Sequence, residues 1–473
     1  MNQRLGVRGP VDLAAFACIA LLAIALTLPA IYNRFPLVFP DTTAYFSVTY
    51  SSQWTLDRAG FYGLFLKPFL LRFPQTPSVW IAIAAQTLCI SAILWAVFRR
   101  LLPNAPASLA LPLLIGVALA TSLPWHAAQF LPDAFTGPLV LAVWFAATRD
   151  MGSKGTPLLW LLTATLALLH YTHLGLVIAC AFACLLVCYL TGTPRREIVK
   201  RAVAAMVTVT AVAAAHITIH GAYFGRWTIS PLGNYFLFAR LSEEGLVPAW
   251  MDRHCGVDAP QRLCDLRSEI PADSQRILWT SDSPFIERVH ARVGNAAHDP
   301  EIWSWIDMMG IAARGSIKEE PMAFLADALR QTGDQLVHFQ AADDLCPQSC
   351  AGKTWFPDRP AIESQVNASR QLEGTIDKPP IRFVTSITSI IGLLMLLPMV
   401  ALAIRRRDTL ALALLVTIVA ALVGNAFMAG ALSDVRDRYQ SRVVWLAPFA
   451  VALLAARFRR RADDLANKTA IVR

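Results

Sequence analysis

Apolar segments long enough to cross a bilayer recur along this chain, and they constrain its fold more than any other feature. A helix needs about 20 apolar residues to cross the hydrocarbon core of a membrane. Charged residues make up 16% of the sequence, whereas soluble domains carry about 25%. We therefore expect an all-α polytopic membrane protein. Its spans number about ten, at residues 13–32, 78–98, 107–124, 137–148, 157–170, 174–190, 202–219, 383–404, 409–428 and 443–457.

Clusters of lysine and arginine beside these spans predict the orientation in the membrane, because such residues are retained on the cytoplasmic side. All of the clusters fall on that side if the chain crosses ten times and both termini are cytoplasmic. Residues 157–190 must then form two short helices that turn at residues 170–173. We expect a multi-pass protein of a bacterial inner membrane. The basic clusters lie at residues 4–8, 99–100, 149–154, 195–201, 405–407 and 457–461.

Two segments lie outside the membrane in this topology and define the domains. Residues 33–77 form an amphipathic loop, which we expect to carry short helices at the membrane surface. Residues 220–382 form a mostly helical periplasmic domain, in which 22 acidic residues outnumber 16 basic ones. The transmembrane modules are residues 1–219 and 383–473. The net charge of +9 therefore comes from the cytoplasmic flanks of the spans, and we expect a lipid bilayer but no nucleic acid as a partner.

Cysteines are divided between the spans and the periplasmic segment. Four external cysteines indicate an oxidising compartment and two disulfides, for which three pairings exist. We favour the local pairs Cys255–Cys264 and Cys346–Cys350 over a zinc site, because no matching histidine spacing accompanies the compact CPQSC pair. A further stripe recurs every four residues and indicates helix packing by small apolar side chains, at Cys180, Cys184 and Cys188.

Two aspartates fall at the same depth on the periplasmic side. Asp41 follows the first span in FPLVFPDTTAYF, and Asp133 lies between the third and fourth spans in WHAAQFLPDAFTG. An ionisable group at membrane depth is costly and so indicates a functional site. We expect Asp41 to act as a general base, and Asp133 to orient the acceptor or bind a divalent cation such as Mg or Mn together with Asp41. The alternative is structural, because Asp41 before two threonines also suits a helix N-cap.

Arginines complement these acids. The last external loop, LSDVRDRYQSRVVWL, presents Arg436, Arg438 and Arg442 immediately before a span. A guanidinium binds phosphate oxygens through two parallel hydrogen bonds, so three of them suit a phosphate or diphosphate. We expect Arg438 and Arg442, with Arg58, to bind the phosphate of a donor. The alternative is that the loop's arginines anchor it at the interface by pairing with Asp434 and Asp437.

Aromatic rings and imidazoles near these charges are candidates to line a sugar or acceptor pocket. In such a cavity a carboxylate takes a proton from an acceptor hydroxyl, and arginines stabilise a phosphate as it leaves. For the histidines near this surface, His126, His170 and His173, a neutral side chain that caps a turn is the alternative. The candidates are Tyr45, Tyr62, Tyr439, His126 and His173.

The order of these parts resembles the GT-C superfamily of integral-membrane glycosyltransferases over residues 1–230. PDTTAYF follows the first span, LDRAGFYGLFL lies further along the same loop, FLPDAFTG follows the third span, and a large external segment follows the seventh. The run from Arg58 to Phe65 is similar to the R-x-P-G-Y-P-L-F run of several such families. The D-x-D and WWDYG-type motifs are missing, and Asp41 is followed by Thr42 where protein mannosyltransferases have a second acid.

The resemblance implies transfer of a sugar from a polyprenyl-phosphate donor to a hydroxyl of a lipid, glycan or protein acceptor. The reaction would proceed with inversion on the periplasmic face, with Asp41 as the general base. The alternative is a transporter or flippase of lipid-linked saccharides, in which the same charges guide a headgroup without reacting. Against it, the sequence shows no repeated halves and few charged or Gly/Pro-broken positions inside the spans.

Overall fold

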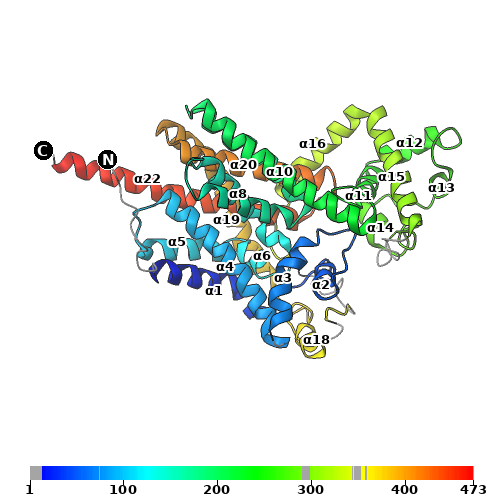
Figure 1. The fold of residues 1–473 in the computed structure, drawn as a ribbon, viewed down its shortest axis with the longest axis horizontal. Coiled ribbons are helices and arrows are strands. Elements are labelled where there is room, and N and C mark those ends of the chain that lie inside the picture. Colours follow the sequence, from blue (N-terminus) through cyan, green and yellow to red (C-terminus); the bar gives the residue numbers. More distant parts are fainter. Residues whose placement is uncertain are drawn as a thin grey trace.

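A computed structural model describes residues 13–73, 75–289, 299–343, 345, 353–356 and 359–471. Within these ranges the chain is built of helices and turns, without a strand, and an isolated parallel bridge joins Leu37 to Gln129. The predicted all-α class is therefore confirmed for the described residues. Figure 1 shows the long helices side by side, with the C-terminal end of α22 and the external helices α12 and α13 at opposite extremes of the molecule.

Seven helices of the described chain are long and apolar enough to cross a membrane, which supports a multi-pass protein. The last candidate span covers Asp437–Asp463, where the polar helix α21 leads into the apolar first half of α22. The seven spans come from α1 (Leu13–Asn33), α4 (Gln75–Leu101), α9 (Tyr171–Leu190), α10 (Arg195–Phe224), α19 (Lys378–Arg405), α20 (Thr409–Gly430) and the pair α21 (Asp437–Val444) and α22 (Leu446–Ile471).

The count of about ten spans is not confirmed, because three of the predicted spans are short helices. α5 (Ala107–Leu119), α7 (Thr136–Thr148) and α8 (Thr156–Leu168) have 13 residues each. At 1.5 Å per residue such a helix is about 20 Å long, less than the roughly 30 Å of hydrocarbon. α7 is nonetheless buried along almost its whole length, and it forms the centre of the bundle.

The basic clusters of the described chain gather at one end of the bundle. Arg100 donates to the carbonyl of Thr148, over 3.3 Å, and Arg201 donates to the carbonyl of Ala147, over 3.1 Å. Arg457 donates to the carbonyl of Leu101 and binds Asp408, over 2.7 Å. These contacts agree with the predicted common side. The cluster at residues 4–8 lies outside the described residues.

Short helices cover the opposite end of the bundle, as predicted for the loop after the first span. They are α2 (Thr42–Ser51) and α3 (Phe61–Arg72), with α6 (Leu123–Ala127) and the 3-10 turn η1 (Pro132–Phe135) from a later connection. Gly63 lets α2 and α3 approach closely, because a Cβ there would lie 2.5 Å from the carbonyl oxygen of Tyr45. Thr49 fixes this approach by donating its hydroxyl to the carbonyl of Gly63, over 2.9 Å.

A second, helical core lies beside the bundle. Its helices are α11 (Gly233–Glu243), α12 (Leu246–His254), α13 (Gln261–Cys264), α14 (Ser274–Trp279) and α15 (Pro300–Glu319), and Phe324 of α16 (Pro321–Val337) packs against it. α18 (Pro360–Asn367) instead buries Ile362 and Val366 in the core of the bundle. Leu56, from the loop between α2 and α3, is fully buried in the core that α11, α12 and α15 form. The loop between α2 and α3 and the helices of the second core are therefore one packed unit at this point.

The cysteines behave as predicted where the structure describes them. The sulfurs of Cys255 and Cys264 lie 2.05 Å apart, at disulfide distance. The predicted pair at residues 346 and 350 lies outside the described residues. The stripe on α9 is buried, and the thiol of Cys180 faces the carbonyl of Thr417 on α20 at 3.8 Å. Packing of small side chains between these two helices accounts for the stripe.

A glycine of α7 provides a test of this packing. A Cβ on Gly137 would lie 2.3 Å from the indole of Trp445, which is fully buried. Replacing Gly137 by alanine should therefore lower the free energy of unfolding by about 1–3 kcal/mol, measured by thermal unfolding in detergent. Gly116 of α5 is the matched control, because a Cβ there would meet no described atom within 4 Å. An equal loss of stability in Gly116→Ala would contradict this interpretation.

Candidate functional site

Two loops from different parts of the chain bring the predicted acids to the same end of the bundle. The amide of Leu37 donates to the carbonyl of Ala128, and the amide of Phe130 donates to the carbonyl of Leu37, both over 2.9 Å. The hydroxyl of Thr42 donates to the carbonyl of Phe130, over 3.1 Å. The chain after α1 is thereby tied to the chain that enters η1, so that both loops form the floor of one site.

Asp41 is held by two arginines. One carboxylate oxygen accepts from Arg58 Nη2 over 2.6 Å, and the other accepts from Arg438 Nη2 over 3.4 Å. Its side chain makes no capping hydrogen bond to α2 in the described chain, so the alternative of a helix cap does not hold. Burial opposes ionisation, but the two guanidiniums outweigh it and hold the pKa of Asp41 below its ordinary value. The carboxylate is therefore ionised at neutral pH.

Asp133 forms a second, more deeply buried pair. Its carboxylate accepts from Arg442 Nη1, and Arg442 is only 1% exposed. Arg442 also donates from Nε and Nη2 to the amide oxygen of Asn425, over 3.2 and 2.9 Å, and from Nη2 to the hydroxyl of Thr172, over 3.3 Å. Burial opposes ionisation here too, yet Arg442 keeps the pKa of Asp133 well below its ordinary value.

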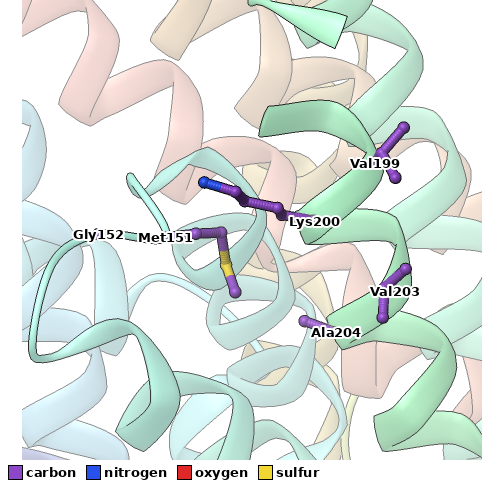
Figure 2. Close-up of a pocket in the computed structure, with 6 residues that line it drawn as sticks. All are labelled: Met151, Gly152, Val199, Lys200, Val203 and Ala204. Atoms are coloured by element: carbon purple, nitrogen blue, oxygen red, sulfur yellow. The ribbon is translucent and has the colours of Figure 1, made fainter. Parts of the chain in front are cut away.

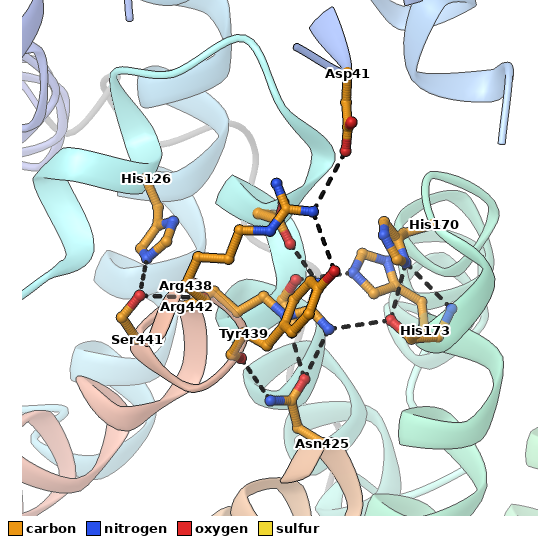
Figure 3. A network of polar contacts seen from close by, with 12 residues as sticks. Asp41, His126, His170, His173, Asn425, Arg438, Tyr439, Ser441 and Arg442 are labelled. Atoms are coloured by element: carbon orange, nitrogen blue, oxygen red, sulfur yellow. Dashed lines mark hydrogen bonds and ion pairs between the residues drawn. The ribbon is translucent and has the colours of Figure 1, made fainter. Parts of the chain in front are cut away.

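One helical turn separates the two arginines that receive these aspartates. Arg438 and Arg442 are four residues apart on α21, so their side chains leave the same face of the helix. Figure 3 shows both guanidiniums in the space between Asp41 and Asn425. Arg438 also lies over the ring of Phe39, with its Cζ 4.1 Å from the ring centroid, and donates to the hydroxyl of Tyr439 over 3.3 Å. Tyr439 therefore contacts the network, while its predicted place in a sugar pocket stays a prediction.

The anchor alternative applies to a neighbouring arginine instead. Arg436 binds Asp434 over 2.6 Å and has a half-exposed side chain. Asp437 accepts from the backbone amide of Gln340 over 2.8 Å. Arg436 therefore pairs within its own loop, as the anchor alternative proposed. Arg438 and Arg442, which were predicted to bind phosphate, instead pair with Asp41 and Asp133.

The structure buries the other predicted pocket residues to different degrees. Tyr45 and Tyr62 lie fully in the core, with ring centroids 5.1 Å apart, and the hydroxyl of Tyr62 donates to Gln86 over 2.7 Å. His173 is hydrogen-bonded through both ring nitrogens, to the hydroxyl of Thr136 and the carbonyl of Leu166. These three side chains are buried in the core next to the site, whereas they were predicted to line a sugar pocket.

His126 lies at the edge of the network. Its Nε2 is 2.9 Å from the hydroxyl of Ser441, on the same helix as Arg438 and Arg442. Burial lowers the pKa of His126 to about 4, so the ring is neutral near pH 7. A neutral imidazole at this position fixes the orientation of α21, and this role agrees with the alternative given for the histidines.

Two contributors to the network were not predicted from the sequence. Asn425 on α20 and Thr172 on α9 bind Arg442. Asn425 had a usable signal, because a polar amide inside an apolar span usually faces a partner. Thr172 had none, since its contact with Arg442 depends on how α9 packs beside α21. The hydroxyl of Thr172 also lies 2.9 Å from Nδ1 of His170, which caps α9 by accepting from the amide of Thr172, as the alternative for the histidines proposed.

An apolar cavity of about 590 Å³ lies between α3, α4, α7 and α8. Phe61 and Phe135 line it, and they follow Arg58 by three residues and Asp133 by two residues. Leu159 and Phe145 line it further towards the basic end of the bundle. The cavity is thus an apolar space whose lining includes residues close in sequence to two members of the charged network.

A second hollow lies at the basic end of the bundle and is separate from this site. It has a volume of about 500 Å³ and lies between the turn at Met151–Gly152 and one face of α10, as Figure 2 shows. Lys200 lines it, and its amine binds Glu197 over 2.8 Å. We assign no ligand to it.

Asp41 and Asp133 are the candidate ligands for a divalent cation, and in the structure each binds a guanidinium. In the described residues no group of three or more His, Cys, Asp or Glu side chains is arranged to hold a metal ion. The contact that Asp133 makes in this structure positions Arg442.

Comparisons with known proteins find no relative. No protein-family model, no curated protein and no solved structure matches this chain. Function must therefore be argued from the site itself.

Proposed function

We propose that this protein is a membrane glycosyltransferase of the GT-C type. It would transfer a sugar from a polyprenyl-phosphate donor to an acceptor hydroxyl of a lipid, glycan or protein. The observation that carries the proposal is the pair of buried carboxylate–arginine contacts beside an apolar cavity. Carboxylate, guanidinium and apolar space are the groups that a base, a phosphate and a lipid chain require.

The reaction is a displacement at the anomeric carbon. The acceptor hydroxyl attacks this carbon, and the bond between the carbon and the phosphate oxygen breaks with inversion. Asp41 receives the hydroxyl proton, and polyprenyl phosphate leaves with the electron pair of the broken bond. Arg58 and Arg438 neutralise the charge that develops on the leaving phosphate.

Binding of the donor would also prepare the base. In the structure both oxygens of Asp41 accept hydrogen bonds from arginine, and this lowers its basicity. A donor phosphate competes for the same guanidiniums, because it offers more charge and more oxygen atoms. As Arg58 and Arg438 turn to the phosphate, the pKa of Asp41 rises and one oxygen becomes free for the acceptor hydroxyl. Asp133 keeps Arg442 in place during this exchange.

The lipid chain and the orientation follow from the surroundings of the site. The cavity between α3, α4, α7 and α8 would hold part of the polyprenyl chain. The basic end of the bundle would face the cytoplasm, because lysine and arginine are retained there. The site and the helices α11–α15 then lie on the periplasmic side of a bacterial inner membrane. Both termini lie in the cytoplasm when the short helices α5, α7 and α8 cross the membrane together with the seven long spans.

The fate of a labelled donor tests this function. Purified protein in vesicles would receive a polyprenyl-phosphate hexose, radiolabelled in the sugar, together with a membrane extract as acceptor. We expect label to leave the donor and appear in acceptor material, with release of polyprenyl phosphate. Vesicles without protein are the control, and a parallel sample with a chelator reports whether a metal contributes. An intact donor that moves to the other leaflet would refute the proposal in favour of a transporter.

A further inference from the structure

An aromatic ring from the external domain covers the arginine that binds Asp41. The Cζ of Arg58 lies 5.5 Å from the ring centroid of Trp279, at the end of α14. The Trp279 side chain is 41% exposed, although it lies beside a buried charged network. A guanidinium over an indole face is a favourable cation–π arrangement. The exposed part of the indole is accessible to a ligand that approaches Arg58 from outside the membrane.

The chain holds this ring firmly. Asp273 caps α14 by accepting from the amide of Arg276, over 2.8 Å. Ile277 and Leu278 are buried in the external core, and Tyr235 donates its hydroxyl to the carbonyl of Ile277 over 2.7 Å. The residue that follows, Trp279, is therefore placed by a short and well-anchored helix. Its exposure is built into the fold.

Arg58 retains hydrogen-bonding capacity beneath this ring. Its Nη2 binds Asp41, and its Nη1 binds the backbone carbonyl of Asp57 over 2.9 Å. Its Nε is buried and has no hydrogen-bond partner among the residues that the structure describes. A buried donor without a partner is costly, and an incoming phosphate oxygen would satisfy it.

We propose that Trp279 and Arg58 together form a glycosyl-phosphate subsite. The exposed surface of the indole stacks on the apolar face of the sugar ring, and the guanidinium binds the phosphate that the sugar carries. The subsite supplies the aromatic wall that Tyr45 and Tyr62 do not, because the core buries both. This assignment rests on the proposed function for its place in the reaction, but the binding of a sugar phosphate does not depend on catalysis.

A binding measurement on the full-length protein in detergent tests the subsite. The probes are a hexose 1-phosphate and inorganic phosphate, both titrated by calorimetry. We expect wild type to bind the hexose 1-phosphate about tenfold more tightly, a difference of about 1.4 kcal/mol. Trp279→Ala should abolish this preference and leave the affinity for inorganic phosphate unchanged within about twofold. Trp279→Phe should retain part of the preference.

Trp227 provides the matched control, because it is 72% exposed and lies after α10. Trp227→Ala should keep the full preference for the hexose 1-phosphate. An undiminished preference in Trp279→Ala, or no preference in wild type, would overturn the subsite. The label-transfer measurement separates failure of the subsite from failure of the proposed function. If Trp279→Ala transfers sugar as fast as wild type and keeps the binding preference, only the subsite is rejected. If wild type binds the hexose 1-phosphate but transfers no label, only the glycosyltransferase function is rejected.

Discussion

Replacing Asp41 by asparagine should lower the rate of sugar transfer by about 10²–10⁴-fold, the usual contribution of a general base. The amide has nearly the shape of the carboxylate, so the fold around α2 should persist, but it cannot accept the acceptor proton. The measurement is the initial rate of label transfer from the polyprenyl-phosphate hexose by equal amounts of wild-type and variant protein. A variant with the full wild-type rate would remove Asp41 from the mechanism.

Phosphate binding distinguishes loss of a base from general damage to the site. Without the carboxylate, Arg58 and Arg438 lose the anion that competes with a ligand. Asp41→Asn should therefore bind inorganic phosphate more tightly than wild type, by about tenfold or ~1.4 kcal/mol. A damaged site would lose both transfer and phosphate binding.

The matched control is the neighbouring acid. The carboxylate of Asp57 lies 3.7 Å from Nη1 of Arg58 and belongs to the same loop as Asp41. Asp57→Asn should keep the transfer rate within a few-fold of wild type. A loss as large as that of Asp41→Asn would show that net charge around Arg58, rather than a base, is what the first substitution removes.

The spans and the meeting of acids with arginines were predictable because each follows from a large energetic cost. Long apolar runs must lie in lipid, and seven of them do form helices of sufficient length. A charge at membrane depth is costly and indicates a functional site, so Asp41 and Asp133 were expected to share a cavity with Arg58, Arg438 and Arg442. The structure brings these residues together, but it pairs the arginines directly with the acids, whereas the sequence indicated a phosphate as their ligand.

The direction of aromatic side chains could not be predicted in the same way. Tyr45 and Tyr62 look alike in sequence to rings that line a pocket, but the close approach of α2 and α3 at Gly63 turns both inward. Trp279 comes from a segment more than 200 residues after Arg58, and nothing local links the two. Such contacts depend on packing between distant elements, where small differences in helix placement decide which side chain faces the site.

The buried pair of Asp133 and Arg442 should matter more for stability than any other ion pair near the site. Asp133→Ala leaves Arg442 without a counter-charge in a place where it is only 1% exposed. Breaking one partner of a buried pair costs about 3–5 kcal/mol. We expect this loss in the free energy of unfolding, measured by denaturant or thermal unfolding of the purified variant in detergent.

The pH dependence of this loss has a definite sign. The pKa of Asp133 is lower in the folded protein than its ordinary value of 3.8. The ion pair therefore stabilises the fold fully at pH values above 3.8, and this stabilisation is lost as the pH falls through the folded pKa. The difference between wild type and Asp133→Ala should therefore be constant from about pH 5 to 8 and start to shrink only in strong acid.

Two further variants decide whether an uncompensated charge is the cause. Arg436→Gln removes an arginine whose pair with Asp434 is half-exposed, and it should cost about 1 kcal/mol or less. The double variant Asp133→Leu/Arg442→Met removes both charges, and it should recover most of the stability that Asp133→Ala loses, because apolar replacements of a buried pair are often tolerated. The double variant should not recover the rate of sugar transfer. Arg442 would no longer bind Asn425 and Thr172, and the side chains around Arg58 and Arg438 would lose this support. A double variant as unstable as Asp133→Ala would show that shape, rather than charge, makes this pair important.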